Sequence, residues 1–104
     1  MFTDIVGSTA RWDANRAAMQ EALQRHDAVV RAAIEGCGGR VFKTVGDAFC
    51  AAFENVGAAL DAAVAAQRNI DREDWRAVNG LRVRMAVHAG EAEERDDDYF
   101  GPAV

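Results

Sequence analysis

The amino-acid sequence predicts an α+β domain in which helices cover one face of an antiparallel β-sheet. Apolar residues recur every three or four positions between residues 16 and 35, as on one face of a helix. Two short apolar segments flank Gly46-Asp47, a pattern typical of a β-hairpin. From Leu81 to His88 larger apolar residues recur at every second position, which indicates a strand with one buried face.

The first part of the chain predicts a strand and two helices. Met1 to Val6 has the character of a strand end, and Gly7-Ser8-Thr9 forms a turn into a short helix that carries Trp12. A second helix is expected from about Arg16 to Glu35, with Asn15 as its N-cap, before a glycine cluster ends it. We expect its buried face to hold Met19, Leu23, His26, Val30, Ala33 and Ile34.

The second part of the chain predicts a hairpin over residues 41–53, a helix after Asn55, a strand over 81–87 and the start of another strand near Tyr99. The polar segment from Asp71 to Gly80 is expected to be a loop that contains Trp75. The larger apolar residues of the helix after Asn55 predict its buried stripe, which comprises Val56, Leu60, Val64 and Ile70.

The size and composition limit the possible function classes. The 104 residues fit one domain, residues 1–104, whose two ends both look cut. The net charge of −5 argues against nonspecific nucleic-acid binding, which requires a basic surface. No apolar run approaches the roughly 20 residues of a membrane-spanning helix, and no signal peptide is visible. With Cys37 and Cys50 as reduced thiols, we expect a cytoplasmic protein without nucleic-acid or membrane contact.

Two acidic residues occupy positions where strands end. Asp4 follows the first apolar segment and Asp47 lies in the hairpin turn, so both can converge on one or two divalent cations. Taken alone, Asp47 is better explained as an ordinary turn residue. Asp4 lies between Phe2 and Ile5, where an acid is costly unless it is paired or binds a metal.

The Gly7-Ser8-Thr9 turn has the composition of an anion site. A glycine allows close approach to the backbone, and the first amides of the following helix carry partial positive charge. The alternative is an ordinary N-cap by Ser8 or Thr9. The P-loop pattern is absent.

Four sequence blocks in order, FTDIVGST, FKTVGDAF, VRMAVHAGEA and DYFG, span nearly the whole chain. Together they resemble the catalytic domain of class III nucleotide cyclases, most closely the soluble bacterial members. The resemblance implies part of a ferredoxin-like antiparallel sheet with helices on one face. It also implies conversion of a nucleoside triphosphate to a 3′,5′-cyclic monophosphate and pyrophosphate, in cyclic-nucleotide signalling.

The same resemblance assigns roles to individual residues. Asp4, Asp47 and the carbonyl of Ile5 would hold two Mg²⁺ or Mn²⁺ ions, and the Gly7 to Thr9 amides would hold the β- and γ-phosphates. Lys43 and Asp98 stand where the family reads the base, and this pair favours adenine, so the substrate is expected to be ATP. Without the resemblance, Lys43 is a solvated strand residue and Asp98 the end of an acidic run.

The resemblance also implies a homodimer, because family active sites lie between two domains and this chain carries both the metal-binding and the base-reading residues. The Asn and Arg that the family places after its FG segment do not occur in these 104 residues, and Glu91 replaces a basic residue found in some members. We therefore expect little turnover from this chain alone. The alternatives are a noncatalytic cyclase-like module that binds nucleotide or dimerises to regulate an attached domain, and a generic α+β interaction domain.

Overall fold

A computed structural model describes residues 1–88, 93–95 and 98–100. The elements, in chain order, are β1 (Phe2–Ile5), α1 (Ser8–Ala14), α2 (Arg16–Gly36), β2 (Arg40–Val45), β3 (Ala48–Ala52), α3 (Val56–Arg72), the 3₁₀ helix η1 (Arg76–Val78), β4 (Val83–Ala86), β5 (Glu93–Arg95) and β6 (Asp98–Phe100). The predicted order of elements is therefore confirmed as far as β4. After β4, β6 coincides with the strand start predicted near Tyr99, whereas β5 was not predicted.

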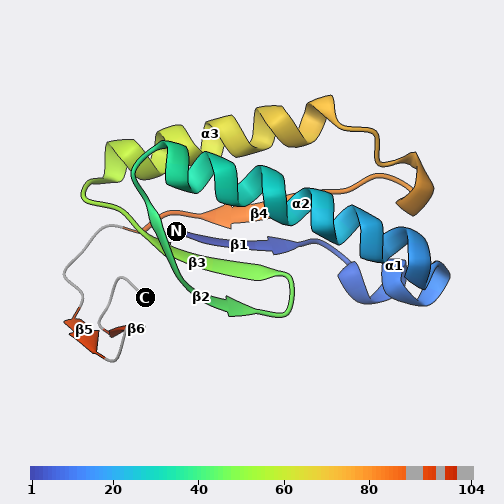
Figure 1. The fold of residues 1–104 in the computed structure, drawn as a ribbon, viewed down its shortest axis with the longest axis horizontal. Helices are drawn as coiled ribbons and strands as arrows, with labels where there is room; N and C mark the ends of the chain where they lie inside the picture. The colour runs from blue at the N-terminus through green and yellow to red at the C-terminus, as the bar shows by residue number, and fades with distance from the viewer. Residues whose placement is uncertain (89–92, 96–97, 101–104) are drawn as a thin grey trace.

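The fold is α+β, as predicted. Four strands form an antiparallel sheet in the order β2-β3-β1-β4, and β5 pairs with β6 in a separate hairpin. Helices α2 and α3 lie on the same side of the four-stranded sheet (Figure 1). The end of β1, the β2–β3 turn and α1 lie at the same end of the molecule, so β1, one of the two inner strands, leads directly into the region of the Asp47 turn and the Gly7-Ser8-Thr9 turn.

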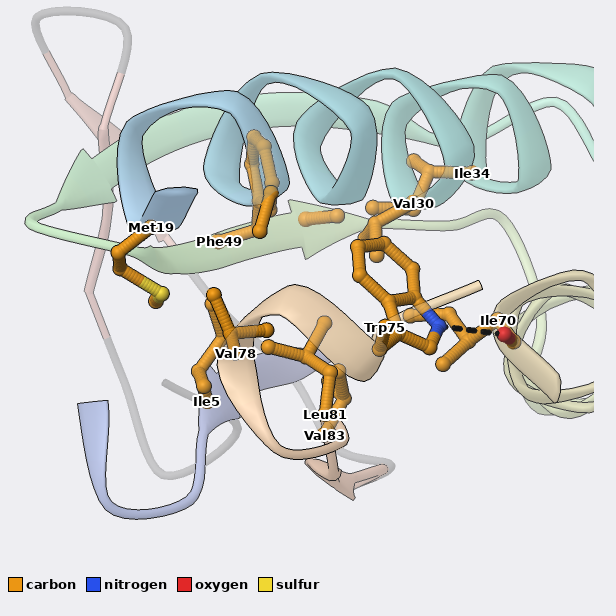
Figure 2. Close-up of a cluster of buried hydrophobic side chains, with 12 residues drawn as sticks. Ile5, Met19, Val30, Ile34, Phe49, Ile70, Trp75, Val78, Leu81 and Val83 are labelled. Carbon is orange, nitrogen blue, oxygen red and sulfur yellow. Dashed lines mark hydrogen bonds between the residues drawn. The ribbon is translucent and has the colours of Figure 1, made fainter. Parts of the chain in front are cut away.

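The hydrophobic core lies between the sheet and the two long helices. Helix α2 contributes Met19, His26, Val30, Ala33 and Ile34 as predicted, whereas Leu23 is only partly buried and Ala22 is buried in addition. Asn15 caps this helix through a hydrogen bond from the Ala18 amide to its side chain. Figure 2 shows side chains from β1, α2, β3, α3, η1 and β4 converging in one cluster.

The predicted buried stripe of α3 is wrong. Val56, Leu60 and Val64 are 48%, 52% and 50% exposed, and only Ile70 of the four is buried. The face turned inward instead carries alanines at 59, 62 and 66. This helix packs against α2, and small side chains allow the two helices to approach closely. Helix α3 has two apolar faces, and the sequence-based prediction chose the one with the larger side chains, whereas the alanine face is the buried one.

The segment from Asp71 to Gly80 is more ordered than a polar loop. Helix α3 continues to Arg72, and Trp75 is buried, with its indole Nε1 donating a hydrogen bond to the Ile70 carbonyl at 2.7 Å (Figure 2). The 3₁₀ helix η1 follows and adds Val78 to the core. Because the residues around Trp75 are polar, the sequence did not indicate that its side chain belongs to the core. No helix among the described residues has the length and apolar character to span a bilayer.

The two faces of α3 give a direct test of this packing. We expect Leu60→Ala to change the free energy of unfolding by less than about 0.5 kcal/mol, because the side chain is half exposed. Ile70→Ala, on the same helix, should cost about 2 to 5 kcal/mol through the cavity that it leaves. Chemical denaturation of both variants measures the difference. A comparable loss in the two variants would contradict the assignment of the faces.

Candidate active site

The structure brings the two predicted metal-binding acids to the same end of the sheet. Asp4 lies in β1, and Asp47 lies in the turn between β2 and β3. The Ile5 amide donates a hydrogen bond to Oδ1 of Asp47 at 3.1 Å. Asp47 is thus a turn residue whose side chain also contacts β1, the strand that carries Asp4. Gly46 beside it has a positive φ of 58°, which the tight turn requires.

Asp4 forms an ion pair that sequence analysis did not identify. Arg84 of β4 lies opposite it in the sheet and donates from Nε to Oδ1 at 2.9 Å and from a terminal nitrogen to Oδ2 at 2.7 Å. The side chain of Asp4 is 21% exposed and that of Arg84 is 70% exposed. These hydrogen bonds hold the pKa of Asp4 below its usual value, with a smaller Coulombic contribution from Arg84, whereas desolvation opposes the shift.

The register of the strands places the predicted base-reading lysine on the same sheet face as Asp4. Lys43 lies opposite Cys50, which lies opposite Phe2, and Asp4 follows Phe2 by two positions. Residues directly opposite each other share a face, as do residues two apart on a strand. Thr3 and Ile5, between these positions, are buried on the helix side. Lys43 is exposed and stands two strands away from Asp4.

The partner predicted for Lys43 lies on a strand that contacts β2. Asp98 is the first residue of β6, and β6 contacts the strand that carries Lys43. The side chain of Asp98 lies outside what the structure describes, as does Glu91. The two base-reading positions are therefore on contacting strands, with only the lysine described at the level of its side chain.

The Gly7-Ser8-Thr9 turn does not contain an ordinary side-chain cap. The N-cap of α1 is Gly7 itself, in the left-handed conformation at φ 65°, and no side chain caps the helix. The alternative of a Ser or Thr N-cap is therefore wrong. A Cβ on Gly7 would also lie 3.1 Å from a terminal nitrogen of Arg11, so both the conformation and the close approach favour glycine.

The donor set at the end of β1 fits a magnesium-type site rather than a cage made of protein ligands alone. Among residues 1–88, and in the rest of the described chain, no cluster of three or more His, Cys, Asp or Glu side chains could hold a metal ion. Two carboxylates nevertheless lie at the same end of the sheet, and Oδ2 of Asp47 takes no part in the hydrogen bond to Ile5. Mg²⁺ is commonly bound by one or two carboxylates together with phosphate oxygens and water.

Comparison with known proteins identifies the family. Residues 1–95 match the family model for the adenylate and guanylate cyclase catalytic domain. The chain belongs to this family. An adenylate cyclase of Mycosarcoma maydis is 36% identical over an alignment that covers the whole chain and 5% of the relative. A receptor-type adenylate cyclase of Trypanosoma congolense is 30% identical and covers 97% of the chain, which spans 19% of that relative. This cyclase domain therefore matches a small part of much longer proteins.

Solved structures share the fold. Adenylate cyclases from Trypanosoma brucei, solved in their monomeric state, include a chain with a TM-score of 0.89 and 29% identity, over 98% of this chain and 61% of that one. An adenylate/guanylate cyclase/hydrolase from Silicibacter pomeroyi matches with a TM-score of 0.73 and 25% identity, over 97% of this chain and 60% of the other. The ordered sheet and helices are therefore those of a cyclase catalytic domain.

The Asp4–Arg84 pair predicts a measurable titration. Because the pKa of Asp4 is lower in the folded state than in the unfolded state, the pair stabilises the fold above the ordinary Asp pKa of about 4. That stabilisation is lost as the pH falls through the lowered value. In Arg84→Ala, without metal, we expect the pKa of Asp4 to rise toward its ordinary value, as measured by carboxyl-carbon NMR. An unchanged pKa would contradict the pairing.

Proposed function

We propose that this cyclase domain takes part in converting ATP to 3′,5′-cyclic AMP and pyrophosphate. In this reaction the ribose 3′-oxygen loses its proton and attacks the α-phosphorus, and the bond from that phosphorus to the pyrophosphate oxygen breaks. The observation that carries the proposal is the hydrogen bond between Asp47 and the Ile5 amide, which holds the second acid beside the strand of the first. Because the chain belongs to the cyclase family, we assign this pair of acids to the cyclase reaction.

Asp4, Asp47 and the Ile5 carbonyl are the proposed ligands of two Mg²⁺ or Mn²⁺ ions. When bound, these ions would supply positive charge that favours loss of the 3′-hydroxyl proton and stabilises the developing charge on the phosphate. The N–H and C=O of one residue in an antiparallel strand point toward the same neighbour. Since the Ile5 amide points to Asp47, its carbonyl lies on the side of the strand where that carboxylate stands.

Arg84 gives Asp4 a counter-charge in the absence of metal. Its two hydrogen bonds engage both carboxylate oxygens of Asp4. Each of these oxygens accepts one hydrogen bond from Arg84 and keeps a second lone pair, which a cation can use. The arginine of this pair is 70% exposed, and an ion pair with a solvated partner is weak, so Asp4 stays available for a stronger ligand.

The remaining parts of the proposed site bind the nucleotide. The amides of Gly7, Ser8 and Thr9 are the proposed donors to the β- and γ-phosphates, since the Gly7 turn leaves its amides without a side-chain cap. Lys43, with Asp98, is proposed to read adenine: an ammonium donates to adenine N1, and a carboxylate accepts from the exocyclic amine. Guanine presents a donor at N1, which a lysine donor does not complement.

A second copy of the chain is the proposed partner across the sheet face that carries Asp4 and Lys43. Phe2 is 44% exposed and Val45 is 61% exposed, and both lie on that face according to the strand register. Exposed apolar side chains beside charged ones are typical of an interface. A noncatalytic module that binds nucleotide without turnover would use the same surface and remains the alternative function.

Assay of cyclic AMP and cyclic GMP formation with Mn²⁺, in a chain extended past Val104, tests the proposed activity. We expect selective use of ATP, and a loss of more than about a hundredfold in Asp47→Asn, because even outer partners of metal ligands contribute 10- to 100-fold. Asp61→Asn, which changes an exposed acid on α3, is the matched control and should retain activity. ATP binding by a folded dimer without turnover would contradict the enzyme and favour the regulatory module.

A further inference from the structure

The Arg11 side chain folds back from α1 onto the turn that precedes it. One terminal nitrogen, Nη1, donates to the carbonyl of Val6 at 2.8 Å and to that of Gly7 at 3.3 Å. Its Nε donates to the carbonyl of Gly80 at 2.9 Å. The guanidinium therefore joins two segments about 70 residues apart in the sequence, the β1–α1 turn and the loop that leads to β4.

These two segments flank the candidate site. The turn follows directly on Asp4 and Ile5, and the loop precedes the strand of Arg84. The Val6 amide donates to the Arg82 carbonyl at 2.9 Å, which extends the pairing of β1 with β4 up to the turn. Arg11 thus holds the end of this strand pair together between the proposed metal ligands, which end at Ile5, and the proposed phosphate donors, which begin at Gly7.

Because the peptide bond is planar, these contacts to carbonyls also fix the direction in which the neighbouring N–H groups point. In a trans peptide the C=O and the following N–H point in opposite directions. Because Arg11 holds the carbonyls of Val6 and Gly7, the N–H groups of Gly7 and Ser8 must point away from the guanidinium. The Gly7 carbonyl also accepts the Arg11 backbone amide at 3.4 Å, whereas the side chain of Arg11 is the donor to the Val6 carbonyl. Without the guanidinium, a glycine at φ 65° therefore allows the peptide plane before it to rotate more freely.

We propose that Arg11 is a positioning residue of the cyclase site: it holds the Val6 and Gly7 carbonyls and so orients the Gly7 and Ser8 amides toward the polyphosphate of the nucleotide. The inference rests on the proposed function of this turn. Arg11 acts through the backbone and does not contact the ligand. An arginine is required because its planar fork supplies several fixed donors at once, whereas a lysine has the charge without that geometry.

Binding of Mg²⁺–pyrophosphate by the 104-residue chain, followed by the amide NMR signals of Gly7 and Ser8, tests this role. We expect Arg11→Lys to raise the dissociation constant about tenfold, in line with other residues that orient a binding group. The control is Arg25→Lys, which removes another arginine contact to a backbone carbonyl, that of Asp74 at 2.8 Å, and leaves the contacts to the Val6 and Gly7 carbonyls in place. It should lower the melting temperature without changing the dissociation constant.

Each other outcome is decisive. Equal dissociation constants for Arg11→Lys and the wild type would overturn the positioning role while leaving the phosphate site intact. Absence of binding at Gly7 and Ser8 in the wild type would overturn the proposed phosphate site, and this inference with it.

A measurement on the wild type alone covers the case in which Arg11→Lys does not fold. The Nε–H signal of Arg11 should remain protected from exchange and change little when Mg²⁺–pyrophosphate is added, since this group stays on Gly80. A large change at Arg11 Nε with a loss of protection would show that the guanidinium leaves the carbonyls for the ligand, which contradicts the proposal.

Discussion

The contact between the Ile5 amide and the Asp47 carboxylate is the constraint on which the site depends. It fixes the tip of the β2–β3 hairpin against the end of β1, although the two residues are 42 positions apart. The pairing of β1 with β3, in which Thr3 lies opposite Phe49, brings the hairpin to this strand, and the contact extends that pairing to the turn that carries Asp47. The helices contribute indirectly, because their packing against the sheet buries Ile5 and so fixes the strand from which its amide points.

Two arginines complete the same region in different ways. Arg84 pairs with the Asp4 carboxylate across neighbouring strands and lowers its pKa. Arg11 binds only backbone carbonyls and closes the turn after β1. A cation can compete with Arg84 for the Asp4 carboxylate. The carbonyls that Arg11 holds are uncharged, and none of them is a proposed ligand of metal or nucleotide. Metal binding can therefore change the contacts of Arg84, whereas those of Arg11 should stay in place.

Sequence patterns predicted the elements that depend on local periodicity. The helix ending in the glycine cluster, the hairpin around Gly46 and the alternating strand before His88 were confirmed because each has a regular spacing of apolar residues. The inner face of α3 was not predicted, since an alanine face and a valine–leucine face are both apolar and only tertiary packing distinguishes them. Trp75 was concealed by the polar residues around it.

The candidate site was predicted in part for a similar reason. Asp4, Asp47 and Lys43 were found through sequence blocks that resemble a known family. The structure places Asp4 and Asp47 at one end of the sheet, and Asp4 and Lys43 on one face of it. Arg84 and Arg11 were missed because their partners are set by strand register and by contacts between distant segments. The two-residue period around Arg84 was visible, but nothing in a single sequence shows that Arg84 stands opposite Asp4.

The central claim is that Asp4 and Asp47 form one cation site, and Mn²⁺ binding by the 104-residue chain tests it most directly. Free Mn²⁺ is measured by electron paramagnetic resonance in the wild type, in Asp4→Asn and in Asp47→Asn. The account predicts that each single substitution weakens binding by about tenfold or more, because both carboxylates contact the same ions. Wild-type affinity in Asp47→Asn, with binding lost only in Asp4→Asn, would contradict a shared site.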